Sequence, residues 1–220
     1  MSDMIRVHIF VEGQTEETFV RTVLYEHFFN KNFYLNPILI RTSSRGRGGA
    51  TNYDKIKWQI EKKCKEDHQS FVTTMFDLFK IPTNFPGYES IVNISDPYKK
   101  VEHIENQWLK EINEFNFIPY ISLHEFEALL FSNLQKFEEW FGRDSANILA
   151  QELKQFDSPE HVNNGPETAP SKRITNQCIG YDKPLHGSSI ALSIGLDTIR
   201  SKCKHFNRWL KRLEDLKKNN

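Results

Sequence analysis

Acidic residues follow three apolar segments of the sequence, at the point where each segment ends. Glu12 closes "IRVHIFVE", Asp77 closes "FVTTMFD", and Glu125 follows His124 at the end of "FIPYISLH". Clustered carboxylates raise one another's pKa unless a cation neutralises them. Mg²⁺ or Mn²⁺ suits such oxygen ligands and keeps water molecules available for a substrate phosphate. These residue types therefore predict a divalent-cation site that could activate water against a phosphodiester.

Two further acids are candidate ligands for the same cation. Glu16 lies one helical turn after Glu12 in "VEGQTEE", and Glu127 follows Glu125 in "HEFEALLF". The alternative is that these acids belong to first helical turns, where negative charge favours the positive end of the helix. Glu12 and Asp77 are harder to explain in that way, because each ends an apolar strand where Gly or Asn would be the neutral choice.

The elements that would position these acids alternate between strand and helix. Alternating or continuous apolar runs predict strands over 5–12, 35–42, 71–77 and 117–124. Apolar stripes of helical period predict helices over 15–29, 53–67, 96–115 and 125–132. This order favours an α/β fold of Rossmann-like type with a mostly parallel central sheet, whose strands share one carboxyl edge. Strand patterns stop after residue 133, which predicts a core of residues 1–133 and a helical extension of residues 134–220 packed on it.

Composition limits the classes of partner. Lys plus Arg and Asp plus Glu number 29 each, so the formal net charge is zero and a generally basic nucleic-acid-binding surface is excluded. The sequence shows neither a signal-peptide layout nor an apolar run of about 18 residues, so we expect a cytoplasmic protein without a membrane partner. The three cysteines are far apart, which favours reduced, buried thiols.

Basic residues outside the acid positions are candidates for contacts with phosphate. Arg45 and Arg47 lie in the glycine-rich segment "RTSSRGRGG", and Lys172 and Arg173 lie in "PSKR". A lysine beside a scissile phosphate would stabilise developing charge, which makes Lys172 a candidate catalytic residue. His186, before a glycine in "KPLHG", is a candidate acid, base or nucleic-acid contact. The alternative for each is an ordinary exposed or structural side chain.

Five segments in register resemble the bacterial family catalogued as domain of unknown function 4276. They are "VEGQTEE", "TMFDLFKIPTNFPGY", "PYISLHEFEALLFS", "PSKRI" and "HGSSIALSIGLDTIRSKCKHFNRWL". That family is grouped with Toprim-like domains, found in topoisomerases, primases and the nuclease half of the overcoming-lysogenization-defect (OLD) proteins. Its members often occur in phage-defence gene neighbourhoods, sometimes beside an ATPase. The resemblance therefore implies a Toprim-like core.

The resemblance also implies roles for single positions. The Toprim glutamate at the end of the first strand falls on Glu12, and the second acid of OLD-like nucleases falls on Glu16. The Asp-x-Asp motif begins at Asp77, but Phe79 replaces its second aspartate. The metal site has therefore either lost a standard ligand or obtains one elsewhere, and the nearest substitutes are Glu125 and Glu127, with His124 as a further candidate.

Two functions follow from this resemblance. One is an Mg²⁺- or Mn²⁺-dependent nuclease that acts on DNA or RNA. The other is a catalytically weak Toprim-like module that binds nucleic acid or a partner ATPase, because the Asp-x-Asp motif is incomplete. Neither the oligomeric state nor the number of metal ions follows from the sequence.

Overall fold

The computed structural model describes residues 4–41, 53–162, 165 and 167–218. Its strands are β1 (Ile5–Val11), β2 (Phe33–Leu39), β3 (Ser70–Asp77), β4 (Phe117–Ile118) and β5 (Ile121–Ser122). They form one sheet in the order β2-β1-β3-β4, with β5 also paired to β3, and each of these pairs is parallel. This arrangement confirms the predicted α/β fold with a parallel sheet.

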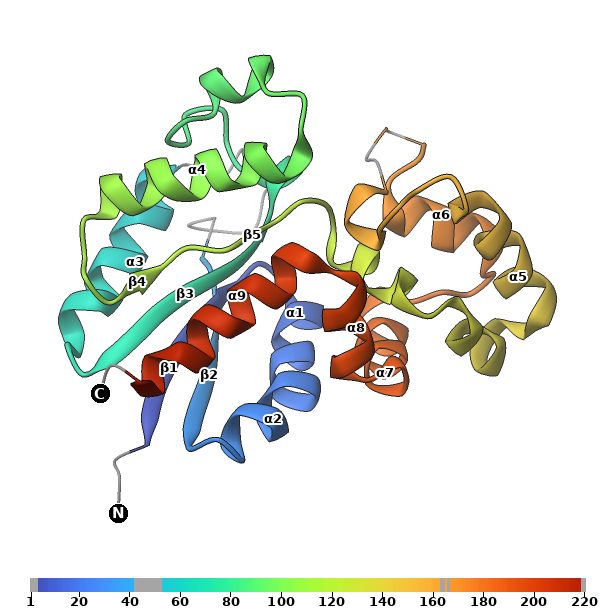
Figure 1. Ribbon diagram of the computed structural model, residues 1–220, viewed down its shortest axis with the longest axis horizontal. Coiled ribbons are helices and arrows are strands. Elements are labelled where there is room, and N and C mark those ends of the chain that lie inside the picture. Colours follow the sequence, from blue (N-terminus) through green and yellow to red (C-terminus); the bar gives the residue numbers. More distant parts are fainter. Residues whose placement is uncertain (1–3, 42–52, 163–164, 166, 219–220) are drawn as a thin grey trace.

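Helices cover both faces of the sheet (Figure 1). The helices of the first half are α1 (Gln14–Phe19), α2 (Tyr25–Phe29), α3 (Tyr53–Glu66) and α4 (Pro97–Ile112), and a π-helical turn, Val20–Leu24, joins α1 to α2. Alternate β1 residues, among them Val7 and Ile9, pack with α1, α2 and the C-terminal helices. Phe10 points to the other face and packs with α3 and α4. The period-2 pattern of β1 therefore describes both buried faces correctly.

The expected strand 117–124 is interrupted. It forms only the short strands β4 and β5, because Pro119 has no backbone N–H and Tyr120 bonds to a side chain. The Tyr120 N–H donates to the Thr74 hydroxyl at 3.0 Å, and that hydroxyl donates to the Tyr120 carbonyl oxygen at 2.8 Å. A threonine on β3 thus replaces part of the backbone ladder.

Two expected helices also differ. The segment predicted as a helix over 125–132 is a 3-10 segment, Phe126–Ser132, in which every residue is buried. The helix predicted over 96–115 ends at Ile112, because Asn113 adopts a left-handed conformation with φ of 50°. Phe115 therefore leaves the predicted apolar stripe and is 74% exposed.

The C-terminal helices pack on the sheet and beyond its carboxyl edge (Figure 1). They are α5 (Glu138–Leu153), α6 (Pro170–Gln177), α7 (Lys183–Ile194), α8 (Leu196–Lys202) and α9 (Lys204–Asp215). Helix α9 lies on the sheet, where Trp209 donates to the Thr73 hydroxyl at 2.9 Å and stacks on Tyr120 at 4.3 Å. Division of the chain at residue 133 stays a prediction. Within the described ranges, no helix combines the length and apolar character needed to cross a bilayer.

Candidate active site

Glu12 and Asp77 meet at the carboxyl edge of the sheet. Strands β1 and β3 are adjacent and parallel, and Val11 lies opposite Met75, so the residues that follow leave the sheet side by side. The Asp77 backbone N–H donates to Glu12 Oε1 at 2.8 Å. Asp77 is only 4% exposed. The parallel register therefore brings together the two acids that the sequence singles out.

Lys80 bridges these two acids. Its Nζ lies 2.7 Å from Asp77 Oδ2 and 3.5 Å from Glu12 Oε2. Lys80 reaches back because the 3-10 turn Leu78–Lys80 follows β3 directly. Burial acts to lower the pKa of Lys80, but the charges of Asp77 and Glu12 outweigh it and raise the pKa. The ammonium is therefore fully protonated at neutral pH.

The two acids keep raised pKa values despite this lysine. Burial, with the neighbouring charge of Asp77, raises the pKa of Glu12 to about 7. Burial also raises the pKa of Asp77, although Lys80 acts in the opposite direction. One ammonium is therefore too little positive charge for both carboxylates.

Glu16 and Glu127 form a second pair around another lysine. Glu16 is 4% exposed in the first turn of α1, and Glu127 has no exposed surface. Lys183 Nζ lies 3.2 Å from Glu16 Oε1 and 3.0 Å from Glu127 Oε2. Neither Glu127 oxygen has an aligned hydrogen-bond donor among the residues that the structure describes. Burial raises the pKa of Glu127, against the influence of Lys183.

Close packing of α7 places Lys183 over these acids. Lys183 is the first residue of α7, and the Asp182 side chain caps the helix by accepting from Leu185 N–H at 2.9 Å. A Cβ atom on Gly187 would lie 3.0 Å from Thr15 and 3.3 Å from Phe126. A larger residue at this position would crowd both side chains, so glycine favours this close approach of α7 to α1.

The two lysine-bridged pairs act as one electrostatic cluster. The charges of Asp77 and Glu16 both raise the pKa of Glu12, while Lys183 lowers that of Asp77. Within the described ranges, no group of three or more Asp, Glu, His or Cys side chains is arranged to hold a metal ion. The donors still suit a hard cation in type and charge, because four carboxylates share only two lysines. A cation at Glu12 and Asp77 would have to take the place of Lys80.

Glu125 and His124 have other roles. Glu125 Oε2 accepts from the Ser171 backbone N–H at 3.0 Å, which ties the start of α6 to the chain that follows β5. His124 is 8% exposed and stacks on Phe79, with ring centroids 5.5 Å apart. Burial lowers the pKa of His124 to about 4, so its imidazole is neutral at pH 7. Among the described residues Glu125 pairs with neither Lys80 nor Lys183, although its charge acts to raise the pKa of Glu127.

Lys172 and Arg173, the two basic residues of "PSKR", lie on α6 in different environments. Lys172 is exposed. Arg173 Nε donates to the Thr168 carbonyl oxygen at 2.8 Å, and its guanidinium lies 3.8 Å from Glu152. Arg173 therefore joins two segments of the C-terminal part. The structure supports a structural role for Arg173 and does not pair Lys172 with the acids.

The remaining predicted contacts are His186 and two arginines of the glycine-rich segment. His186 Nδ1 accepts from the Asp182 backbone N–H at 2.9 Å, and its ring packs against Trp140. It therefore helps to form the first turn of α7. Arg45 and Arg47 lie outside the described residues.

The residue types alone did not identify Lys80 or Lys183 as members of the site. Lys80 had a local signal, since it follows Asp77 by three residues in "DLFK" and a 3-10 turn returns its side chain to that acid. Lys183 had no local signal in the sequence, because its partners Glu16 and Glu127 are distant from it along the chain. Only the packing of α7 against α1 brings them together.

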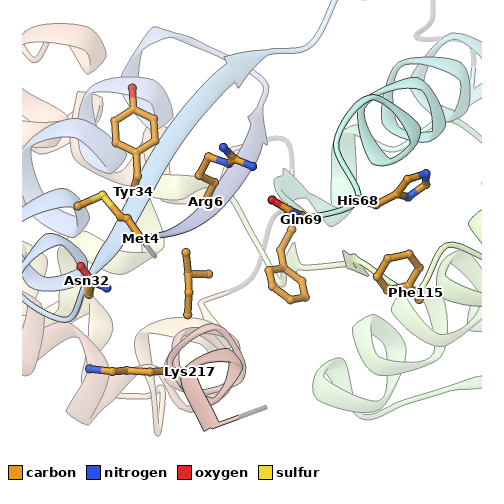
Figure 2. A pocket seen from close by; sticks show the side chains of 10 residues that line it. Met4, Arg6, Asn32, Tyr34, His68, Gln69, Phe115 and Lys217 are labelled. Carbon is orange, nitrogen blue, oxygen red and sulfur yellow. The ribbon is translucent and has the colours of Figure 1, made fainter. Parts of the chain in front are cut away.

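A cavity of about 990 Å³ lies at the opposite edge of the sheet. Figure 2 shows side chains around it, including Arg6, Tyr34, His68 and Lys217, which come from the amino ends of strands and the C-terminus. None of the predicted acids lines it. Arg6 is already paired with Asp67 at 2.8 Å. We place the functional site at the carboxyl edge, where the buried ionisable groups converge.

Glu12 makes stability depend on pH. An acid whose pKa rises from 4.5 to about 7 on folding binds a proton that the unfolded chain releases. The free energy of unfolding should therefore fall as pH rises through this interval. Glu12→Gln should flatten this fall, as measured by urea unfolding at several pH values. Equal slopes in the two proteins would contradict the raised pKa.

The fold and the site define an α/β protein with a parallel sheet and a cluster of carboxylates and lysines at the carboxyl edge of that sheet. The chain matches the family model described as "Domain of unknown function (DUF4276)" over residues 11–214. It therefore belongs to this family, as the resemblance of its motifs indicated. None of the curated proteins matches the chain.

Solved structures of one bacterial protein are also similar. They show the C-terminal region of the Xanthomonas campestris pv. campestris OLD protein, phased with iodine or with platinum. The first is 13% identical, with a TM-score of 0.43, and the match covers 98% of each chain. The second is 13% identical, with a TM-score of 0.45, and the match covers 98% of this chain and 96% of the other.

Proposed function

We propose that this protein is a metal-dependent nuclease whose active site is the cluster at the carboxyl edge of the sheet. One observation carries the proposal: at adjacent strand ends the Asp77 N–H donates to Glu12, Asp77 is buried and Glu12 half-buried, and both carboxylates have raised pKa values. Groups perturbed by burial and by charged neighbours are concentrated at functional sites. A setting in phage defence, and a partner ATPase, are parts of this proposal that only the family resemblance supports.

Each residue of the cluster would have a separate role in the reaction. Glu12 and Asp77 would hold Mg²⁺ or Mn²⁺, with Glu16 as a further donor. When bound, the cation supplies Lewis acidity and an activated water. Lys183 holds Glu16 and Glu127 in their buried positions. Lys80, 46% exposed, can leave the carboxylates and neutralise a substrate phosphate instead.

Cleavage by the purified protein tests this proposal. Labelled single-stranded and duplex DNA and RNA would be incubated with Mg²⁺, with Mn²⁺ and with EDTA. We expect cleavage that needs one of the cations and stops in EDTA. Lack of cleavage of all four substrates, both for the protein alone and with an ATPase encoded beside it, would refute the proposal.

The internal neutralisation of the acids favours a second candidate. Lys80 and Lys183 already pair with all four carboxylates of the cluster, and Phe79 stands where the motif has its second aspartate. A protein with this arrangement could bind nucleic acid or an ATPase without cleaving. Binding that survives Glu12→Ala together with Asp77→Ala, with no cleavage by the wild type, would favour this module.

Replacement of Lys80 should increase the affinity for Mn²⁺. Lys80→Met removes the ammonium that competes for Asp77 and Glu12, so isothermal titration should show a Kd several-fold lower than that of the wild type. Mn²⁺ should also raise the Tm of this variant more than that of the wild type, because a ligand stabilises the state that binds it. The matched control is Lys63→Met, which removes a half-buried lysine paired with Glu66 three residues away. Weaker Mn²⁺ binding by Lys80→Met would contradict competition between the Lys80 ammonium and the cation for these carboxylates.

A further inference from the structure

Phe79 is an exposed aromatic residue inside the candidate active site. It lies between Asp77 and Lys80 in the 3-10 turn that follows β3, and it is 58% exposed. Both neighbours face the acid cluster, since Lys80 lies 2.7 Å from Asp77. A single exposed apolar side chain is common on protein surfaces, so its exposure alone indicates nothing.

The exposure of Phe79 becomes informative because the ring of His124 packs against it. His124, only 8% exposed, stacks on Phe79 with ring planes 20° apart and centroids 5.5 Å apart. His124 Nδ1 is buried and has no hydrogen-bond partner among the described residues. The buried imidazole therefore supports one face of Phe79 and holds its ring in a defined plane, while Phe79 remains mostly exposed.

We propose that Phe79, backed by His124, is a stacking platform for an unpaired base, and that the substrate is single-stranded nucleic acid. Bases stack on aromatic side chains with little dependence on sequence. This inference rests on the proposed function and names its substrate class. The same substitution that removes an expected metal ligand thus adds a surface for a base.

The spacing of the neighbouring groups supports this assignment. Phe79 directly precedes Lys80, whose ammonium lies 2.7 Å from Asp77 and 3.5 Å from Glu12, so a nucleotide stacked on Phe79 could offer its phosphate to this ammonium. A nucleotide presents this combination of a flat ring and an anion. In a duplex, the base faces are covered by neighbouring base pairs, so a platform of this kind selects strands whose bases are free.

Binding without cleavage tests the platform. Anisotropy of a labelled oligonucleotide, as a single strand and as a duplex of the same sequence, would be measured in EDTA and in CaCl₂. Phe79→Ala should weaken single-strand binding by about 5- to 100-fold, the range found when stacking residues are truncated. Phe79→Trp should retain it. Duplex binding should be weaker in the wild type and insensitive to Phe79→Ala.

The chain contains a matched control at the other edge of the sheet. Phe115 is 74% exposed and stacks on His68, with centroids 6.0 Å apart. Phe115→Ala should leave oligonucleotide binding unchanged, and thermal unfolding should show that both alanine variants are folded.

Three outcomes would overturn the inference. They are unchanged single-strand binding in Phe79→Ala, equal losses in Phe79→Ala and Phe115→Ala, or tighter binding of the duplex than of the single strand by the wild type. Cleavage by Phe79→Ala with unchanged binding would overturn the platform and leave the nuclease standing. Loss of cleavage in Glu12→Gln with unchanged single-strand binding would support both the nuclease and the stacking platform.

Discussion

Glu12→Gln is expected to abolish cation-dependent cleavage while the protein stays folded. Glutamine keeps an oxygen that can accept from the Asp77 N–H, as Glu12 Oε1 does at 2.8 Å, but it loses the charge that a hard cation requires. Loss even of residues that support metal ligands costs about 10- to 100-fold, so loss of a ligand should cost at least about 100-fold. Glu12 should also be the more informative acid to replace, because Asp77 is more deeply buried.

The measurement is the initial rate of oligonucleotide cleavage at saturating Mn²⁺, together with the Kd for Mn²⁺. Both should change in Glu12→Gln, and its Tm at pH 8 should equal or exceed that of the wild type, because a carboxylate with a raised pKa is removed. The matched control is Glu17→Gln, since Glu17 lies in the same segment and pairs with exposed Arg21 at 3.0 Å. Equal cleavage by Glu12→Gln and the wild type would exclude Glu12 as a ligand.

Lys183→Met is expected to cause the largest loss of stability. It leaves Glu127, which has no exposed surface, and Glu16, which is 4% exposed, without their shared ammonium. Removing one partner of a buried ion pair typically costs about 3–5 kcal/mol in the free energy of unfolding. Urea unfolding at pH 7 measures this loss. The loss should shrink towards low pH, where Glu127 is protonated and needs no partner.

A double variant separates unpaired charge from lost packing. Lys183→Met combined with Glu127→Gln should recover part of the lost stability, because the amide carries no charge. Lys136→Met, which removes a surface pair with Glu139, should change the free energy of unfolding by less than about 0.5 kcal/mol. A similar small change for Lys183→Met would show that the buried cluster does not depend on this lysine.

Local patterns predicted the parts of the structure that depend on periodicity. The alternation of Ile5, Val7, Ile9 and Val11 predicts a strand that is covered on the face carrying these residues, and they pack together in the core. Asp96 and Pro97 predict the start of a helix, and α4 begins at Pro97 with Asp96 accepting from Tyr98 N–H at 2.9 Å. Such features depend on neighbours in the chain, so they can be recognised without the fold.

The convergence of Glu12 and Asp77 was predictable for a related reason. Parallel strands place their carboxyl ends at one edge of the sheet, so acids at the ends of neighbouring strands must meet. The position of Glu125 is not explained in the same way. It also follows a strand, but Pro119 interrupts the ladder, and Glu125 instead accepts from Ser171 at the start of α6.

The sequence by itself therefore determined the α/β fold, the family and the acids at two strand ends. Only the tertiary structure decided the charge balance of Glu16 and Glu127, because Lys183 is distant from both in the sequence, whereas Lys80 follows Asp77 by only three residues. Lys183 reaches Glu16 and Glu127 only because α7 packs on α1 at Gly187, and His124 supports Phe79 only because β5 lies beside β3. Charge pairing and ring stacking act through space over a few ångströms, and no spacing along the chain specifies them.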